Sequence, residues 1–361
     1  MFKFNQLESI HLEITSRCQA SCPMCSRNFR SGLENPNLKL NDWTLNDFKN
    51  IFTTELLTQI KSFYFCGNFG DPIINDNLID MCHYAVMINP NIEIRIHTNG
   101  GARKTSWWKE LAQVLPVKHN VHIAIDGLED THHLYRVGTT YDNVLKNAKA
   151  FIEAGGKATW TFLKFKHNEH QVEEAERRAK EAGFESFSMK STSRFIGEPR
   201  FKVFDKDGNI SYYLEAPSDS KLSYIDTKTL ENFESFVKDS TIKCYVLETR
   251  QIYIDAFMKV YPCCWLALAS TPTVRHNEDK IVTRIRNRIE TQYKDIICKL
   301  DNNASTRSVK DIINDEQWQL IWKQHWEGEN KLVMCARTCG KAKITQIAQP
   351  QDQFLENKKY E

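Results

Sequence analysis

The chain has 361 residues, 41% of them hydrophobic, which is enough for one large domain, a smaller second domain and a sizeable core. Its 48 Lys and Arg residues and 46 Asp and Glu residues leave a net charge of +2, a balance that argues against nucleic acid as a partner. No stretch approaches the ~20 apolar residues of a membrane span and the N-terminus lacks a signal peptide's apolar core, so we expect a soluble cytoplasmic protein with no membrane partner.

Short runs of β-branched and aromatic residues recur in the first half of the chain, with amphipathic helical patterns between most of them. This alternation predicts βα units around a parallel sheet, an α/β fold of the partial (β/α)6, TIM-like barrel type. In such barrels, sites form in the loops at the C-terminal ends of the strands. The expected strands are residues 10–15, 60–66, 92–97, 121–125, 158–163 and 184–189, and the expected helices are residues 44–52, 78–87, 141–154 and 169–182.

The strand–helix rhythm ends near residue 195, so we predict a first domain over residues 1–195. Residues 196–240 are polar and predict a linker or excursion, with a turn at Asp205-Lys-Asp-Gly208. A small α+β domain is expected over residues 241–345, followed by a tail over residues 346–361. Within it we expect an extended segment at 251–261 and helices at 279–300 and 309–326. The last helix carries Trp318, Trp322 and Trp326, a stripe that predicts packing on the neighbouring domain.

Eleven cysteines in a chain expected to stay in a reducing compartment indicate metal binding rather than disulfides. Cys18, Cys22 and Cys25 form a Cys-x3-Cys-x2-Cys run directly after the first expected strand. Three thiolates can bind three irons of a cubane cluster and leave the fourth iron open, whereas a zinc knuckle usually pairs two ligands with two from a second motif. The spacing therefore favours a 4Fe-4S cluster, with zinc as the alternative. Three cysteines stand apart and are most simply buried apolar thiols: Cys66, Cys82 and Cys298.

The triplet in this position resembles the radical S-adenosylmethionine (SAM) superfamily, in which the open iron binds the amino and carboxylate groups of SAM. The run Phe65-Cys-Gly67-Asn68-Phe-Gly70-Asp71-Pro looks like the Gly-Gly-Glu-Pro motif of that superfamily, whose backbone cradles the SAM amino group. Asp71 replaces the usual glutamate. Thr98-Asn99-Gly100 is similar to a Thr-Asn-Gly motif that lies near the SAM ribose.

A fourth motif surrounds Asp126-Gly127 and Arg136, and it resembles a Ser-x-Asp-Gly … His-Asp-x-x-Arg signature of the branch with a C-terminal cluster domain. Ala124 stands where that branch has serine. Arg136 would pair with the SAM carboxylate, a task suited to a guanidinium group. The four motifs follow in order along most of residues 9–195. The resemblance thus implies SAM binding by Gly67, Asn68, Gly70, Asp71, Asn99, Asp126 and Arg136.

The later cysteines resemble the auxiliary-cluster pattern of the same branch, Cys-x9–15-Gly-x4-Cys followed by further cysteines. Larger SPASM domains hold two auxiliary clusters and need more cysteines than this chain has, so the shorter twitch domain with one 4Fe-4S cluster fits better. Met258 occupies the glycine position, which requires a turn without the residue that is free at positive φ. Cys264 competes with Cys263, but only Cys263 has the x4 spacing, and a zinc site stays the alternative. The ligands implied are Cys244, Cys263, Cys335 and Cys339.

The resemblance implies an enzyme that cleaves SAM reductively and abstracts hydrogen from a substrate carbon through a 5'-deoxyadenosyl radical. The substrate radical is then oxidised through the auxiliary cluster or quenched by a hydrogen donor, for which Cys264 and Cys298 are candidates besides being simple core thiols. Related enzymes modify ribosomally made peptides or oxidise sugar-like alcohols, and both substrates stay open. The implied reducing partner is a flavodoxin or ferredoxin.

Two other classes of function remain as alternatives. A radical SAM enzyme acting on RNA would need a basic groove or an added RNA-binding domain, which the sequence does not indicate. A non-catalytic, metal-stapled binding protein would not need the SAM-like motifs. Because the first expected strand begins about nine residues from the N-terminus, we expect no fused leader-peptide-binding domain there.

Overall fold

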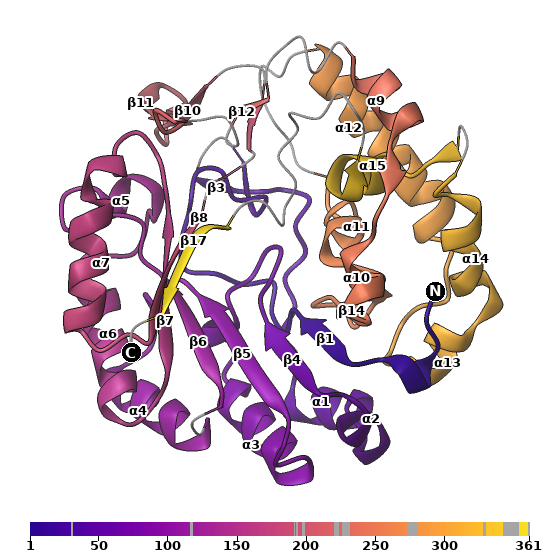
Figure 1. Ribbon diagram of the computed structural model, residues 1–361, viewed down its shortest axis with the longest axis horizontal. Helices are drawn as coiled ribbons and strands as arrows, with labels where there is room; N and C mark the ends of the chain where they lie inside the picture. Colours follow the sequence, from indigo (N-terminus) through magenta and orange to yellow (C-terminus); the bar gives the residue numbers. More distant parts are fainter. Residues whose placement is uncertain are drawn as a thin grey trace.

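A parallel sheet forms the centre of the protein in the computed structural model (Figure 1), which describes residues 1–29, 32–115, 118–190, 192, 194–196, 199–219, 224–225, 232–272, 280–327, 330–341 and 354–359. Its nine strands follow the order β15-β14-β1-β4-β5-β6-β7-β8-β17. The six strands from β1 to β8 in this order pair in parallel, which confirms the predicted α/β partial barrel. They are β1 (Ser9–Leu12), β4 (Ser62–Phe65), β5 (Glu93–Thr98), β6 (Asn120–Ala124), β7 (Ala158–Leu163) and β8 (Ser186–Lys190).

The helices between these strands cover the outer side of the sheet (Figure 1). Threonine side chains start several of them, because Thr44, Thr53 and Thr140 each accept a hydrogen bond from a backbone N–H of the first turn. Gly155 and Gly183 follow two helices with positive φ, as expected for helix ends. The helices are α1 (Leu45–Ile51), α2 (Thr54–Gln59), α3 (Leu78–Ile88), α4 (Thr105–Val114), α5 (His132–Tyr135), α6 (Tyr141–Glu153) and α7 (Val172–Glu181).

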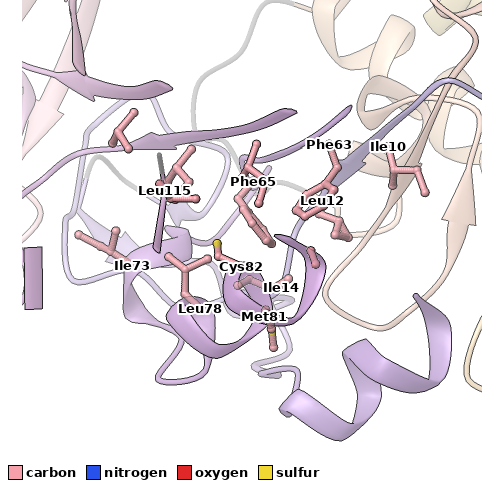
Figure 2. Packing of buried hydrophobic residues seen from close by; sticks show 14 of the residues in the cluster. Ile10, Leu12, Ile14, Phe63, Phe65, Ile73, Leu78, Met81, Cys82 and Leu115 are labelled. Carbon is pink, nitrogen blue, oxygen red and sulfur yellow. The ribbon is translucent and has the colours of Figure 1, made fainter. Parts of the chain in front are cut away.

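The two faces of the sheet differ in chemistry. Ile10 and Leu12 of β1 and Phe63 and Phe65 of β4 are buried on the face that α3 covers (Figure 2). Because side chains alternate along a strand, His11 and its neighbours point to the opposite, inner face. There polar side chains prevail, so that the barrel has an apolar outer layer and a polar interior.

The C-terminal part, by which we mean the described residues 232–341, shares the same sheet. β14 (Gln251–Ile254) pairs in parallel with β1, and β15 (Val260–Tyr261) returns antiparallel to it. The expected extended segment is thus a hairpin, and Met258 itself takes the positive φ of 64° at its turn. The helices of this part (orange and yellow in Figure 1) stand opposite the barrel strands: α9 (Phe233–Asp239), α10 (Tyr245–Glu248), α11 (Cys264–Leu268), α12 (Lys280–Gln292), α13 (Val309–Asn314), α14 (Glu316–Gln324) and α15 (Val333–Cys339).

The 196–240 excursion contains a hairpin, β10 (Arg200–Phe204) and β11 (Ile210–Glu215), which places short extended segments on both sides of the predicted turn, as expected. Two other segments differ from the sequence expectation. The expected helix at 309–326 breaks at Asp315, whose side chain caps α14. The expected tail contributes β17 (Phe354–Lys359), antiparallel to β8. Short pairs complete the fold: β2 (Asn28–Phe29) with β3 (Leu33–Glu34), β9 (Phe195–Ile196) with β12 (Tyr224–Ile225), and β13 (Thr241–Ile242) with β16 (Gly340–Lys341).

The tryptophan stripe is divided between two cores. Trp318 is 1% exposed and belongs to the core of the barrel, whereas Trp326 packs against the core of the C-terminal part. The side chain of Trp322 lies outside the described residues. None of the helices in the described part of the chain combines the length and apolar character needed to cross a bilayer.

The three isolated cysteines have different environments. Cys82 is fully buried in the outer core (Figure 2), as predicted. Cys298 is exposed, so the expectation of a buried thiol is wrong there, because it follows the end of a helical segment on the surface. Cys66 follows β4 and borders the cavity described below.

We predict that Cys82→Ser lowers the free energy of unfolding by about 1 to 3 kcal/mol, because it places a hydroxyl where apolar side chains surround the sulfur. Cys298→Ser is the matched control and should change it by less than about 0.5 kcal/mol. Urea unfolding of both variants measures the difference. Equal stability of the two variants would contradict this assignment of the buried thiol.

Candidate functional site

A cavity of about 560 Å³ lies at the carboxyl ends of the parallel strands. Every one of the six barrel strands, or the loop that follows it, contributes to its wall. The opposite wall comes from the C-terminal part and is mostly apolar, with Phe233, Trp265, Leu268, Ile285, Ile289 and Met334. The cavity therefore has one polar side and one apolar side.

The cysteine triplet lies in the polar wall, in the loop that follows β1. The sulfur of Cys18 accepts hydrogen bonds from the Ala20 backbone N–H at 3.4 Å and from Asn99 Nδ2 at 3.5 Å. Arg136 Nη1 lies 3.8 Å from the sulfur of Cys22. Hydrogen bonds to sulfur are a feature that tunes iron–sulfur clusters. All three thiols, those of Cys18, Cys22 and Cys25, are thus gathered at one place with polar donors around them.

The spacing of the side chains bears on which metal group they suit. Within the described ranges, no three His, Cys, Asp or Glu side chains lie close enough together to hold a single metal ion. A zinc ion needs all its sulfur ligands about 2.3 Å away. A cubane cluster holds its thiolates further apart, because each binds a different iron. Three thiolates from one loop are the donor set that a cubane cluster with one open iron needs.

The loop after β4 approaches its neighbours too closely for side chains. A Cβ atom at Gly70 would lie 1.8 Å from the Thr15 carbonyl oxygen, and one at Gly67 would lie 2.5 Å from Glu13 Oε1. Only glycine therefore fits at these two positions of the loop.

Asp71 ends this loop and is buried beneath it. Its carboxylate accepts hydrogen bonds from Thr98 Oγ1 and the Asn99 backbone N–H, both at 2.8 Å, and from the Ile73 N–H at 3.2 Å. Burial raises the pKa of Asp71. This carboxylate ties the β4 loop to the end of β5 and sets the position of Asn99.

The last motif forms an ion pair at the ends of β6 and β7. Arg136 Nε donates to Asp126 Oδ2 at 2.5 Å, and Asp126 Oδ1 accepts from the Leu163 backbone N–H at 2.6 Å. Asp126 is 1% exposed, so the carboxylate of this ion pair is buried in the protein. The structure brings all seven residues of the sequence-derived set to the cavity that the triplet borders: Gly67, Asn68, Gly70, Asp71, Asn99, Asp126 and Arg136.

Sequence reasoning missed several polar residues of the inner face. His97 and His122 of neighbouring strands stack with ring centroids 4.3 Å apart, and both line the cavity with Lys190. Burial lowers the pKa of His122 to about 3 and lowers that of His97 well below its usual value, so both rings are neutral at pH 7. The signal in the sequence was the position of each histidine within its strand, because every second side chain of a barrel strand faces the interior.

The four later cysteines come together in the C-terminal part. The thiols of Cys244 and Cys339 hydrogen-bond each other, and Cys263 is near enough to Cys335 and Cys339 to act on them electrostatically. The pairing of β13 with β16 brings the first of these thiols beside the last. Cys335 and Cys339 lie one turn apart on α15, a helix that the sequence analysis missed.

The two proposed hydrogen donors lie elsewhere. Cys264 interacts electrostatically with Cys66 and Tyr64, and Cys298 is exposed. Neither belongs to the wall of the cavity, whereas Cys66 does. Besides the cysteine triplet, Cys66 at the end of β4 is a thiol that lines the cavity.

Comparisons with known proteins point to one family. A family model described as the radical SAM superfamily matches residues 12–179. No curated protein matches the chain in sequence.

Solved structures with TM-scores above 0.5 share the fold at low sequence identity. SuiB of Streptococcus suis bound to the precursor peptide SuiA is 16% identical, with 92% of this chain and 72% of SuiB covered and a TM-score of 0.54. The protein anSMEcpe with bound AdoMet and the Cp18Cys peptide is 14% identical, with 96% of this chain and 91% of anSMEcpe covered and a TM-score of 0.51. BtrN in complex with AdoMet and 2-DOIA is 12% identical, with 97% and 98% covered and a TM-score of 0.43.

We predict that Gly70→Ala lowers the free energy of unfolding by about 1 to 3 kcal/mol, because the new methyl group must displace the backbone of Thr15. Gly32→Ala is the matched control, since a Cβ there meets nothing within 4 Å. Thermal unfolding of the metal-free protein reads out both variants. If Gly70→Ala is as stable as the control, the close approach of the two loops is incorrect.

Proposed function

We propose that the protein is an enzyme that cleaves SAM reductively and uses the 5'-deoxyadenosyl radical to abstract hydrogen from a substrate carbon. The match of residues 12–179 to the radical SAM superfamily model supports this proposal. The observation that carries the proposal is the meeting of the cysteine triplet and all four SAM-like motifs at one cavity. A non-catalytic binding protein would not need the cysteine triplet and these motifs to line the same cavity.

The residues of the polar wall have separate tasks in this proposal. Cys18, Cys22 and Cys25 hold a 4Fe-4S cluster, and the backbone of the β4 loop receives the amino group of SAM. Arg136, oriented by Asp126, faces the SAM carboxylate, since a guanidinium group suits a carboxylate. When bound, the cluster supplies the electron and SAM supplies the radical. An electron donor such as a flavodoxin or ferredoxin completes the system.

The C-terminal cysteines serve a second cluster in this proposal. Cys244, Cys263, Cys335 and Cys339 together provide four thiolates, which is full ligation for a cubane. With every iron ligated by protein, the group takes or passes an electron rather than binding substrate. The nearness of these thiols to one another supports the assignment.

A peptide is the substrate class that we favour over a sugar. The wall opposite the cysteine triplet presents Trp265, Leu268 and Ile289, among other apolar side chains, which suit an amino-acid side chain better than a row of hydroxyl groups. Two structures with the same fold contain peptides, SuiA in one and Cp18Cys in the other. The net charge of +2 gives no support to an RNA substrate.

We predict that the anaerobic, reduced protein forms 5'-deoxyadenosine from SAM, even without substrate. Cys18→Ala should reduce this product to the background level, because two thiolates cannot hold the open cluster. Cys298→Ser, an exposed position outside the cavity, should retain wild-type product. Product is quantified by chromatography and mass spectrometry. A wild-type protein that is fully reconstituted and makes none would refute the proposed reaction.

We predict iron and sulfide contents near eight each per chain, roughly two cubanes. The double variant Cys335→Ala/Cys339→Ala should contain about half of each, since it keeps the first triplet and loses two ligands of the second set. Metal analysis by mass spectrometry checks both. One zinc with four irons in the wild-type protein would identify the C-terminal cysteines as a zinc site instead.

A further inference from the structure

The loop that follows β4 rests on a buried carboxylate that none of the sequence motifs contains. Glu13 Oε1 accepts hydrogen bonds from the backbone N–H groups of Phe69 at 2.7 Å and Gly70 at 2.9 Å. Glu13 is 2% exposed, and its other oxygen accepts a hydrogen bond from the hydroxyl of Tyr253. All these partners are neutral donors, and their hydrogen bonds oppose the burial that raises the pKa of Glu13 to about 7.

Tyr253 belongs to the C-terminal part and reaches the loop through the shared sheet. It lies on β14 directly opposite His11 of β1, and its side chain is fully buried. Its hydroxyl thus satisfies the oxygen of Glu13 that the loop does not use. Without that donor, a desolvated oxygen would be left unpaired, which costs about 1 to 3 kcal/mol.

A second hydrogen bond joins the same loop to the C-terminal part. Asn68 Nδ2 donates to the Cys264 carbonyl at 2.8 Å. Cys263, the residue before it, caps the start of α11 and is one of the four gathered thiols. A change in the backbone conformation at Cys263 would therefore move the Cys264 carbonyl group, which accepts the hydrogen bond from Asn68.

We propose that Glu13 and Asn68 are positioning residues through which the C-terminal part sets the shape of the β4 loop, so that the affinity for SAM depends on the state of the second cysteine set. This inference rests on the proposed function, in which the loop receives the SAM amino group. Glu13 holds the loop from below through two backbone N–H groups. Asn68 holds it from the side, at the residue next to a cluster ligand.

The test is equilibrium binding of radiolabelled SAM to the fully reconstituted protein and its variants. Tyr253→Phe and Glu13→Ala should each weaken SAM binding about tenfold, since each removes a hydrogen bond to or from a buried group. Glu13→Gln should stay within about threefold of wild type, because an amide oxygen can still accept from the loop and a tyrosine hydroxyl can also accept. Tyr293→Phe is the control: it removes one hydroxyl, 3.2 Å from that of Tyr261, away from the loop.

A double-mutant cycle tests the link to the second cysteine set. Cys335→Ala/Cys339→Ala should weaken SAM binding in the wild-type background but add little to the effect of Asn68→Ala, because both changes act through the same hydrogen bond. Additive effects would overturn that link. If the cysteine variant does not fold, Tyr253→Phe alone decides whether the C-terminal part shapes the loop.

The outcomes separate this inference from the function on which it rests. Wild-type protein that binds no SAM would refute both. Wild-type binding with an unchanged affinity in Tyr253→Phe, or an equal loss in Tyr293→Phe, would refute the positioning role only. Melting temperatures measured in parallel distinguish the two cases, because a purely structural role would lower stability in both tyrosine variants and leave their SAM affinities alike.

Discussion

The structure depends above all on the pairing of β1 with two strands that lie far apart in the sequence. β4 pairs on one side and β14 on the other, both in parallel and in matching register. Because parallel strands end at the same edge, the loop with the cysteine triplet, the glycine loop and the C-terminal hairpin are brought to one edge of the sheet. A slip of one residue in either pairing would turn His11 and Glu13 toward the apolar outer layer.

The polar interior of the barrel requires that its buried carboxyl groups find hydrogen-bond partners. Asp71 is satisfied by the end of β5, Asp126 by an arginine and a backbone N–H, and Glu13 by backbone and tyrosine donors. These three carboxylates connect neighbouring strand ends and so give the loops their shape. The departures from the motifs that this sequence resembles are accommodated in the same way: the shorter Asp71 is enclosed by its own donors, and Met258 takes the left-handed conformation that a glycine would otherwise supply.

Much of the fold could be predicted because its signals are local. The six strands and the helices α1, α3, α6 and α7 follow from two periodicities, whereas α2, α4 and α5 were not predicted. The triplet follows from the spacing of three residues. The break at Asp315 and the α15 helix could not be predicted with the same ease. A capping aspartate in one case, and a short cysteine-bearing helix in the other, gain their stability from the core into which they pack.

The sequence by itself determined the chemistry of this protein: which thiols are available, which strands carry glycine loops at their ends, and which faces are apolar. These properties depend on residues close together in the chain. Only the tertiary structure decided that Glu13 and Tyr253, 240 positions apart, share a hydrogen bond under the glycine loop, and that Asn68 reaches the turn beside Cys263. Contacts of that kind arise from how two distant segments pair in one sheet, and no local pattern specifies which side chains will then meet.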